Sequence, residues 1–179
     1  MADPTPVPVR TPAPDSALQM LRHTVATLAY RAEKVLREVP DGFADFRPSL
    51  SSRTPAEVLS HLGDLMEWGE RMARGEMRWQ PGVTTEWSAA RDRFFRGLAA
   101  LDAALTAPDA APFTAVIFQG PVADALTHVG QLAMMRGMRG APVRPESYAR
   151  ATITAGRVGL EQAHARVEFD GDASAPKAT

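Results

Sequence analysis

The sequence predicts an all-helical domain, and a four-helix bundle is the arrangement that fits it best. Four segments of roughly 20 residues carry apolar residues at three- and four-residue steps, the spacing of one buried helix face. Proline and glycine break the chain between these segments. Strand signals are weak, because the β-prone run 114–118 is too isolated to build a sheet.

The first segment begins near Asp15 or Ser16, both good N-caps, and Pro40 stops it. Its apolar residues form a single stripe, made of Leu18, Leu21, Val25, Leu28, Ala32, Val35 and Val39. Residues 1–14 are rich in proline, favour extended polyproline II and have little to bury. We expect them to form an N-terminal arm outside the bundle.

The second segment has a strong helix start at Thr54-Pro55-Ala56-Glu57. Thr54 can accept from the third helical amide, Pro55 suits the first helical position, and Glu57 can reach back as a capping box. The helix should run to about Arg74. Its buried seam contains one polar member among apolar ones, in the order Val58, His61, Leu62, Leu65, Trp68 and Met72.

Residues 75–84 hold two glycines and a proline and should form a crossover to the third helix, from about Thr85 to Leu105. The fourth helix should start near Gly120-Pro121 and end near Gly137 or Gly140. The bundle therefore spans residues 15–140. Residues 141–179, with further prolines and glycines, should form a partly irregular C-terminal extension.

Composition limits the classes of function. The formal net charge is −1, so no bulk field favours nucleic acid or an anionic membrane. No cysteine is present, which excludes disulfides, cysteine zinc sites and a thiol nucleophile. No apolar run approaches the ~20 residues that span a bilayer, and the N-terminus does not have the pattern of a signal peptide. We expect a cytoplasmic protein that acts on a small molecule.

The fourth helix carries a polar strip of Asp124, His128 and Gln131 beside its apolar face. A carboxylate and an imidazole four residues apart on a helix can chelate one metal ion. Such a pair is also a common surface feature, and Asp124 and His128 could simply pair with each other. Gln131, one turn beyond His128, is a candidate to orient a substrate or a bound water.

A third ligand could come from His61, the histidine embedded in the seam of the second helix. Two imidazoles and one carboxylate leave coordination positions open, which is typical of a reactive site. This donor set suits Zn, Fe(II), Mn or Ni. A core histidine is more often a structural, hydrogen-bonded residue, and periodicity does not show that the second and fourth helices are neighbours. Asp64 or Glu57 could orient the second ring nitrogen of His61.

Two stretches resemble the DinB-like metalloenzyme family, the DinB/YfiT superfamily. One runs from Thr54 through His61 to Leu62, and the other runs from Gly120 through Asp124 and His128 to Leu132. The resemblance covers residues 16–140 and leaves out both tails. It implies a four-helix bundle with up-down-down-up connectivity and a long crossover between the second and third helices.

The resemblance also implies a metal site supplied by the second and fourth helices, usually with three histidines. His61 and His128 match two of them, whereas Asp124 stands where the family commonly has histidine. Because a carboxylate is a harder ligand and lowers the net charge of the site, metal identity and reaction type are open. Characterised members of the family include metal-dependent transferases and isomerases that use low-molecular-weight thiols, and many other members have no known activity.

Three functional hypotheses follow. The protein is a metal-dependent enzyme that activates a bound water or low-molecular-weight thiol, as a hydrolase or thiol S-transferase would. Alternatively, it is a non-catalytic protein that a metal stabilises and that acts in stress response or through partners. In the third hypothesis it is a helical adaptor without metal. Exposed Met134 and Met138 would fit a helix-packed homodimer.

Overall fold

The protein is all-helical over the residues that the computed structural model describes, which are 14–83, 86–107, 113–165 and 168. No β-strand occurs in these ranges; Glu146 and Glu168 form an isolated antiparallel bridge. The predicted fold class is therefore confirmed at the level of an all-α chain. The elements are α1 (Pro14–Leu36), α2 (Pro55–Ala73), α3 (Trp87–Thr106), α4 (Thr114–Ile117), η1 (Phe118–Val122), α5 (Ala123–Met138) and η2 (Tyr148–Arg150).

The predicted bounds of the second and third helices lie within two residues of those of α2 and α3, whereas α1 ends at Leu36, before the predicted stop at Pro40. Glu38, just beyond this end, has a φ of +49°. At α2 the capping box is present: Thr54 Oγ1 accepts from the Glu57 amide at 3.2 Å, and Glu57 Oε2 accepts from the Thr54 amide at 2.7 Å. Gly75 follows α2 with a φ of +88°, a conformation that favours glycine after a helix. The N-terminal arm lies outside the described residues, except for Pro14, which opens α1.

The last long helical run starts earlier than the sequence predicts. It begins at Thr114 and includes the β-prone run 114–118, because Ile117 is fully buried in the core and tertiary packing overrides local propensity. A π-helical turn, η1, follows and contains Pro121. Proline has no amide to donate to the preceding turn, which accounts for a wider turn at this point. Asp124 is the second residue after this turn, in the first turn of α5.

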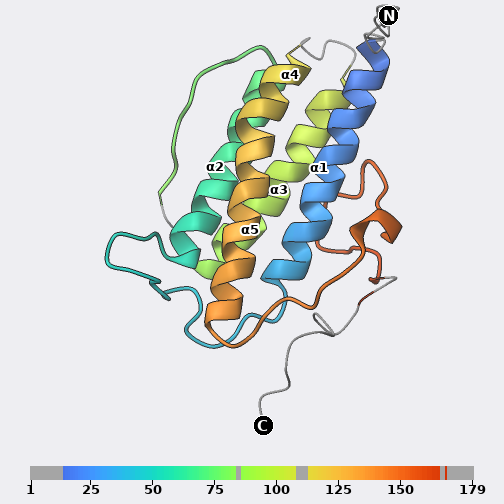
Figure 1. The fold of residues 1–179 in the computed structure, drawn as a ribbon. Helices are drawn as coiled ribbons and strands as arrows, with labels where there is room; N and C mark the ends of the chain where they lie inside the picture. Colours follow the sequence, from blue (N-terminus) through green and yellow to red (C-terminus); the bar gives the residue numbers. More distant parts are fainter. Residues whose placement is uncertain (1–13, 84–85, 108–112, 166–167, 169–179) are drawn as a thin grey trace, which may run out of the picture.

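Figure 1 shows α1, α2, α3 and α5 side by side. The helix α2 packs against α3 and α5, and α1 also packs against α3 and α5. The helices α2 and α3 run in the same direction, and the segment between them returns along the outside of the molecule (Figure 1). The largest fully buried side chains include Leu28, Phe43, Leu59, Leu62, Met66, Phe94, Leu98, Leu101, Ile117 and Leu132.

Two glycines let α2 approach its neighbours closely. A Cβ at Gly97 of α3 would lie 2.7 Å from Met66 Cβ of α2, which is closer than packed atoms allow. A Cβ at Gly69 of α2 would lie 3.3 Å from both Leu101 on α3 and Pro121 in η1. Gly69 therefore marks the point where α2, α3 and the helical run before α5 meet.

The C-terminal extension is held against α1 by a buried polar group that we call the lysine clamp (Tyr30, Lys34 and Glu146). Glu146 accepts from the Tyr30 hydroxyl at 2.6 Å and from Lys34 Nζ at 2.7 Å. Lys34 also donates to Glu168 at 2.6 Å. The Glu146 side chain is 0% exposed and that of Lys34 6% exposed, so the charges of this pair are satisfied inside the protein.

In the described part of the chain, no helix combines the length and the apolar character that crossing a membrane requires. Met134 and Met138 on α5 are exposed, at 60% and 58% of their surface. That exposure is what a helix-packed homodimer would need, and the dimer stays a prediction.

Candidate metal centre

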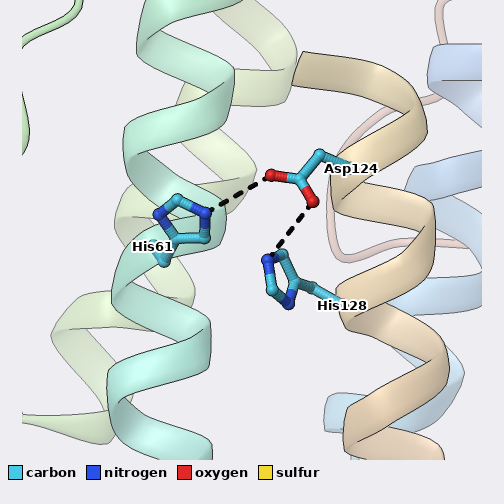
Figure 2. Close-up of side chains that lie close together, drawn as sticks. All are labelled: His61, Asp124 and His128. Atoms are coloured by element: carbon cyan, nitrogen blue, oxygen red, sulfur yellow. Dashed lines mark ion pairs between the residues drawn. The ribbon is translucent and has the colours of Figure 1, made fainter. Parts of the chain in front are cut away.

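The structure brings together the three side chains that the sequence singled out. His61 comes from α2, and Asp124 and His128 come from α5 (Figure 2). His61 Nε2 lies 3.5 Å from Asp124 Oδ2, and His128 Nε2 lies 3.4 Å from Asp124 Oδ1. The two imidazole rings are 4.9 Å apart and nearly perpendicular. We call these residues the donor triad (His61, Asp124 and His128).

The register between α2 and α5 explains this meeting. The two helices run in opposite directions (Figure 1), and Pro121 packs against Gly69 near one end of their contact. From Gly69, α2 leads back two turns to His61, while α5 leads forward from Pro121 to Asp124 and then one turn further to His128. The close approach at Gly69 therefore sets the position of His61 opposite the polar strip of α5.

Gln131 contacts the ring nitrogen of His128 that does not face Asp124. The Nδ1–H of His128 donates to Gln131 Oε1, and the two atoms are 2.7 Å apart. A proton held on Nδ1 leaves the lone pair on Nε2, which is the atom that faces Asp124. The amide oxygen of Gln131 thus favours the tautomer and the ring orientation that a metal ligand needs, and its hydrogen bond is to His128.

His61 has a different environment from the one predicted. Neither expected carboxylate is its partner: Asp64 accepts from Arg93 at 2.7 Å and from the Gly82 amide at 2.8 Å, and Glu57 caps α2. The ring of His61 instead packs edge-on against Trp79 at 5.8 Å. Burial, the nearby His128 and the positive Arg53 lower the pKa of His61, despite the opposing effect of Asp124. A lowered pKa favours the neutral imidazole, the form that binds metal.

The donor set fits a divalent transition metal. A tetrahedral ion with bonds of about 2.0–2.1 Å has ligand atoms about 3.3 Å apart. The two imidazole–carboxylate distances are close to this value, and each reaches a different oxygen of Asp124. Each of the three residues offers one potential ligand atom, and these three atoms all lie within 4.8 Å of one another. The Asp124 side chain, which the sequence placed beside the apolar face of its helix, is 47% exposed. Solvent therefore reaches the triad from this side.

A cavity of about 550 Å³ lies beside His61. Arg47, Arg53 and Trp79 contribute to its walls together with the serines Ser51, Ser52 and Ser60. None of these residues stands out in the sequence pattern as a site residue. They lie in the loop before α2, at its first turns and in the crossover after it, and no periodic pattern shows that such segments converge.

No family model matches the chain, and comparison with curated proteins and with solved structures likewise finds no match.

Proposed function

We propose that the donor triad binds one divalent transition metal and that the protein is a metal-dependent enzyme. The observation that carries this proposal is the convergence of His61, Asp124 and His128 from two helices, with donor atoms within 4.8 Å of one another. Three protein ligands leave positions open for water or substrate. Zn, Fe(II), Mn and Ni are the metals that this donor set suits.

When bound, the metal would supply Lewis acidity that lowers the pKa of a water or a low-molecular-weight thiol and so provides a nucleophile at neutral pH. The chain's own residues supply the rest. Gln131 orients His128 through the hydrogen bond to Nδ1. Trp79 packs against the ring of His61 and limits its rotation. The reaction class is hydrolysis or thiol S-transfer.

We also propose that the chain is a DinB-like four-helix bundle with up-down-down-up connectivity. The parallel course of α2 and α3 in Figure 1, with a connection along the outside, supports this connectivity. The position of the triad supports it too, because the second long helix and the last long helix supply the donors. Asp124, in place of the family's usual histidine, makes the triad two imidazoles and one carboxylate.

The alternative is a metal that only stabilises the fold of a stress-response or interaction protein. A metal closed off by Trp68 and Met135 would favour that alternative. The exposed Asp124 side chain and the open cavity at His61 favour the enzyme instead.

Two measurements test the proposal. Elemental analysis of protein purified without an affinity tag should find close to one equivalent of a transition metal, whereas less than about a tenth of an equivalent would favour simple Asp–His pairing without metal. Hydrolytic and thiol-transfer turnover should then fall on treatment with EDTA and return when metal is added. Turnover that EDTA leaves unchanged, or its absence with every metal and thiol, would contradict the enzyme hypothesis.

A further inference from the structure

The cavity beside His61 is lined by charged side chains of both signs. Four charged side chains other than His61 line it, two arginines and two carboxylates: Arg47, Arg53, Glu57 and Asp64. Equal numbers of opposite charges would suggest a neutral cavity. The contacts of each group decide which charges remain available to a ligand.

Both carboxylates are engaged by the protein. Asp64 has a side chain that is only 9% exposed, and its Oδ1 accepts from Arg93 and from the Gly82 amide. Glu57 accepts from the Thr54 amide as part of the capping box and also pairs with Arg47 at 3.3 Å. Both carboxylates are thus held by protein donors, although Asp64 shares Arg93 with Glu67.

Arg53 differs from Arg47. Arg47 pairs with Glu57 and donates to the Ser52 carbonyl. For Arg53, no hydrogen bond or ion pair with any described residue is found, although it is close enough for its charge to lower the pKa of His61. Its guanidinium is free to form a two-pronged contact with a carboxylate or a phosphate.

The same cavity offers groups that suit the remainder of a small molecule. Trp79 forms an aromatic wall, held edge-on by Trp68 at 5.3 Å and adjoining His61. Trp68 is fixed in turn, because its Nε1–H donates to the Met77 carbonyl at 3.2 Å. The Ser51 hydroxyl on the loop before α2 is exposed and adds polar contact beside Arg53.

We propose that this cavity holds an anionic small-molecule substrate whose carboxylate or phosphate binds Arg53 and whose body lies against Trp79, with its reactive end directed to the donor triad. This inference rests on the proposed metal-dependent function for the identity of the reactive end. The anion contact itself depends on Arg53 and does not need a metal.

The test uses the full chain after EDTA treatment and titrates it calorimetrically with inorganic phosphate and, separately, with succinate. At least one probe should bind with a stoichiometry near one. Arg53→Gln should weaken that binding by about tenfold, the size of a lost charged hydrogen bond. Arg53→Lys should retain part of it. Arg150→Gln is the matched control, because Arg150 is an exposed arginine of the C-terminal extension that does not line the cavity.

The tighter probe identifies the anionic group, carboxylate or phosphate. Binding of neither probe, or equal binding by Arg53→Gln and the unmodified chain, would overturn the inference. A Zn²⁺ titration of the same proteins separates this inference from the proposed function. Arg53→Gln should bind Zn²⁺ as the unmodified chain does, whereas failure of every protein to bind Zn²⁺ would reject the metal site and leave the anion result to be judged alone.

Discussion

The lysine clamp and the donor triad are both groups of ionisable side chains that join two distant parts of the chain, but they treat charge in opposite ways. In the clamp, Glu146 is fully buried and accepts two short hydrogen bonds from Tyr30 and Lys34. In the triad, the half-exposed Asp124 has an imidazole 3.4–3.5 Å from each oxygen.

This difference separates a structural cluster from a binding site. The contacts of the clamp are short, and its buried carboxylate is paired with two donors of the protein itself. Each imidazole of the triad directs Nε2 toward one shared carboxylate, and nothing in the protein shortens those contacts into strong hydrogen bonds. A small cation between the donors would satisfy all of them.

The largest effect should come from breaking the clamp. Lys34→Met leaves Glu146 buried without its cationic partner, and the free energy of unfolding should fall by about 3–5 kcal/mol. Chemical denaturation followed by circular dichroism measures this change. Arg37→Met is the matched control. The Arg37 side chain is 52% exposed, and its ion pair with Glu33 is long, at 3.7 Å. A loss below about 1 kcal/mol in Lys34→Met, the size expected of a surface ion pair, would remove the distinction between the two regions.

The next effect concerns the triad. Asp124→Ala should weaken Zn²⁺ binding by more than about a hundredfold, because loss of even an outer partner of a metal ligand costs about 10–100-fold. Helix packing does not depend on this half-exposed side chain, so the metal-free variant should unfold within about 0.5 kcal/mol of the unmodified chain. Calorimetric Zn²⁺ titration and denaturation of the same samples give both numbers. Full metal retention would mean that another group is the third ligand.

A smaller effect should follow from Gln131. Gln131→Leu removes the acceptor that holds His128 Nδ1–H and should weaken Zn²⁺ binding by about tenfold. Gln131→Glu keeps an acceptor at the same position and should restore most of the affinity. Equal affinities for the two variants would show that Gln131 does not orient His128.

The two regions should also respond to opposite changes of pH: the stabilisation from the clamp should be lost in alkali, and metal binding by the triad should be lost in acid. Burial and the bond to Glu146 raise the pKa of Tyr30. Burial lowers the pKa of Lys34, but hydrogen bonds to Glu146 and Glu168 outweigh it and raise that pKa overall. Both groups hold protons more tightly in the folded chain, so their stabilisation is complete below the unfolded pKa values, about 10, and is lost as pH rises above them.

Metal binding by the triad should instead decline in acid, because a protonated imidazole cannot act as a ligand. The lowered pKa of His61 moves its share of this loss to lower pH than for an exposed imidazole. Denaturation curves above about pH 10 measure the alkaline loss of stability, and Zn²⁺ titrations below about pH 6.5 measure the acidic loss of metal binding. Tyr30→Phe should reduce the alkaline loss and leave the acidic loss of metal unchanged; the reverse pattern would contradict this assignment.

Much of the fold was predictable because its signals are local. The capping box at Thr54 and Glu57 and the glycine after α2 each act over a few residues, and the structure contains both. The start of the last helical run was not predictable. Its β-prone residues become helical through contacts with distant parts of the core, where Ile117 is fully buried.

The candidate site also combines local patterns, which could be predicted from the sequence, with long-range contacts, which could not. The four-residue spacing of Asp124 and His128 is a local pattern, and His61 stood out as a polar residue in an apolar seam. The close approach of Pro121 to Gly69 is a long-range contact, and it sets where His61 lies relative to α5. The aromatic contact of Trp79 with His61 also depends on how a loop folds back, which a single sequence does not reveal.

The central claim is that the donor triad is a metal site, and anomalous diffraction tests it most directly. Crystals of tag-free protein, soaked in Zn²⁺ and measured at the zinc edge, should show one strong peak about 2.0–2.2 Å from His61 Nε2, His128 Nε2 and an Asp124 oxygen. A triad without a peak, or a peak held by other residues while the triad stays paired as in Figure 2, would contradict the account.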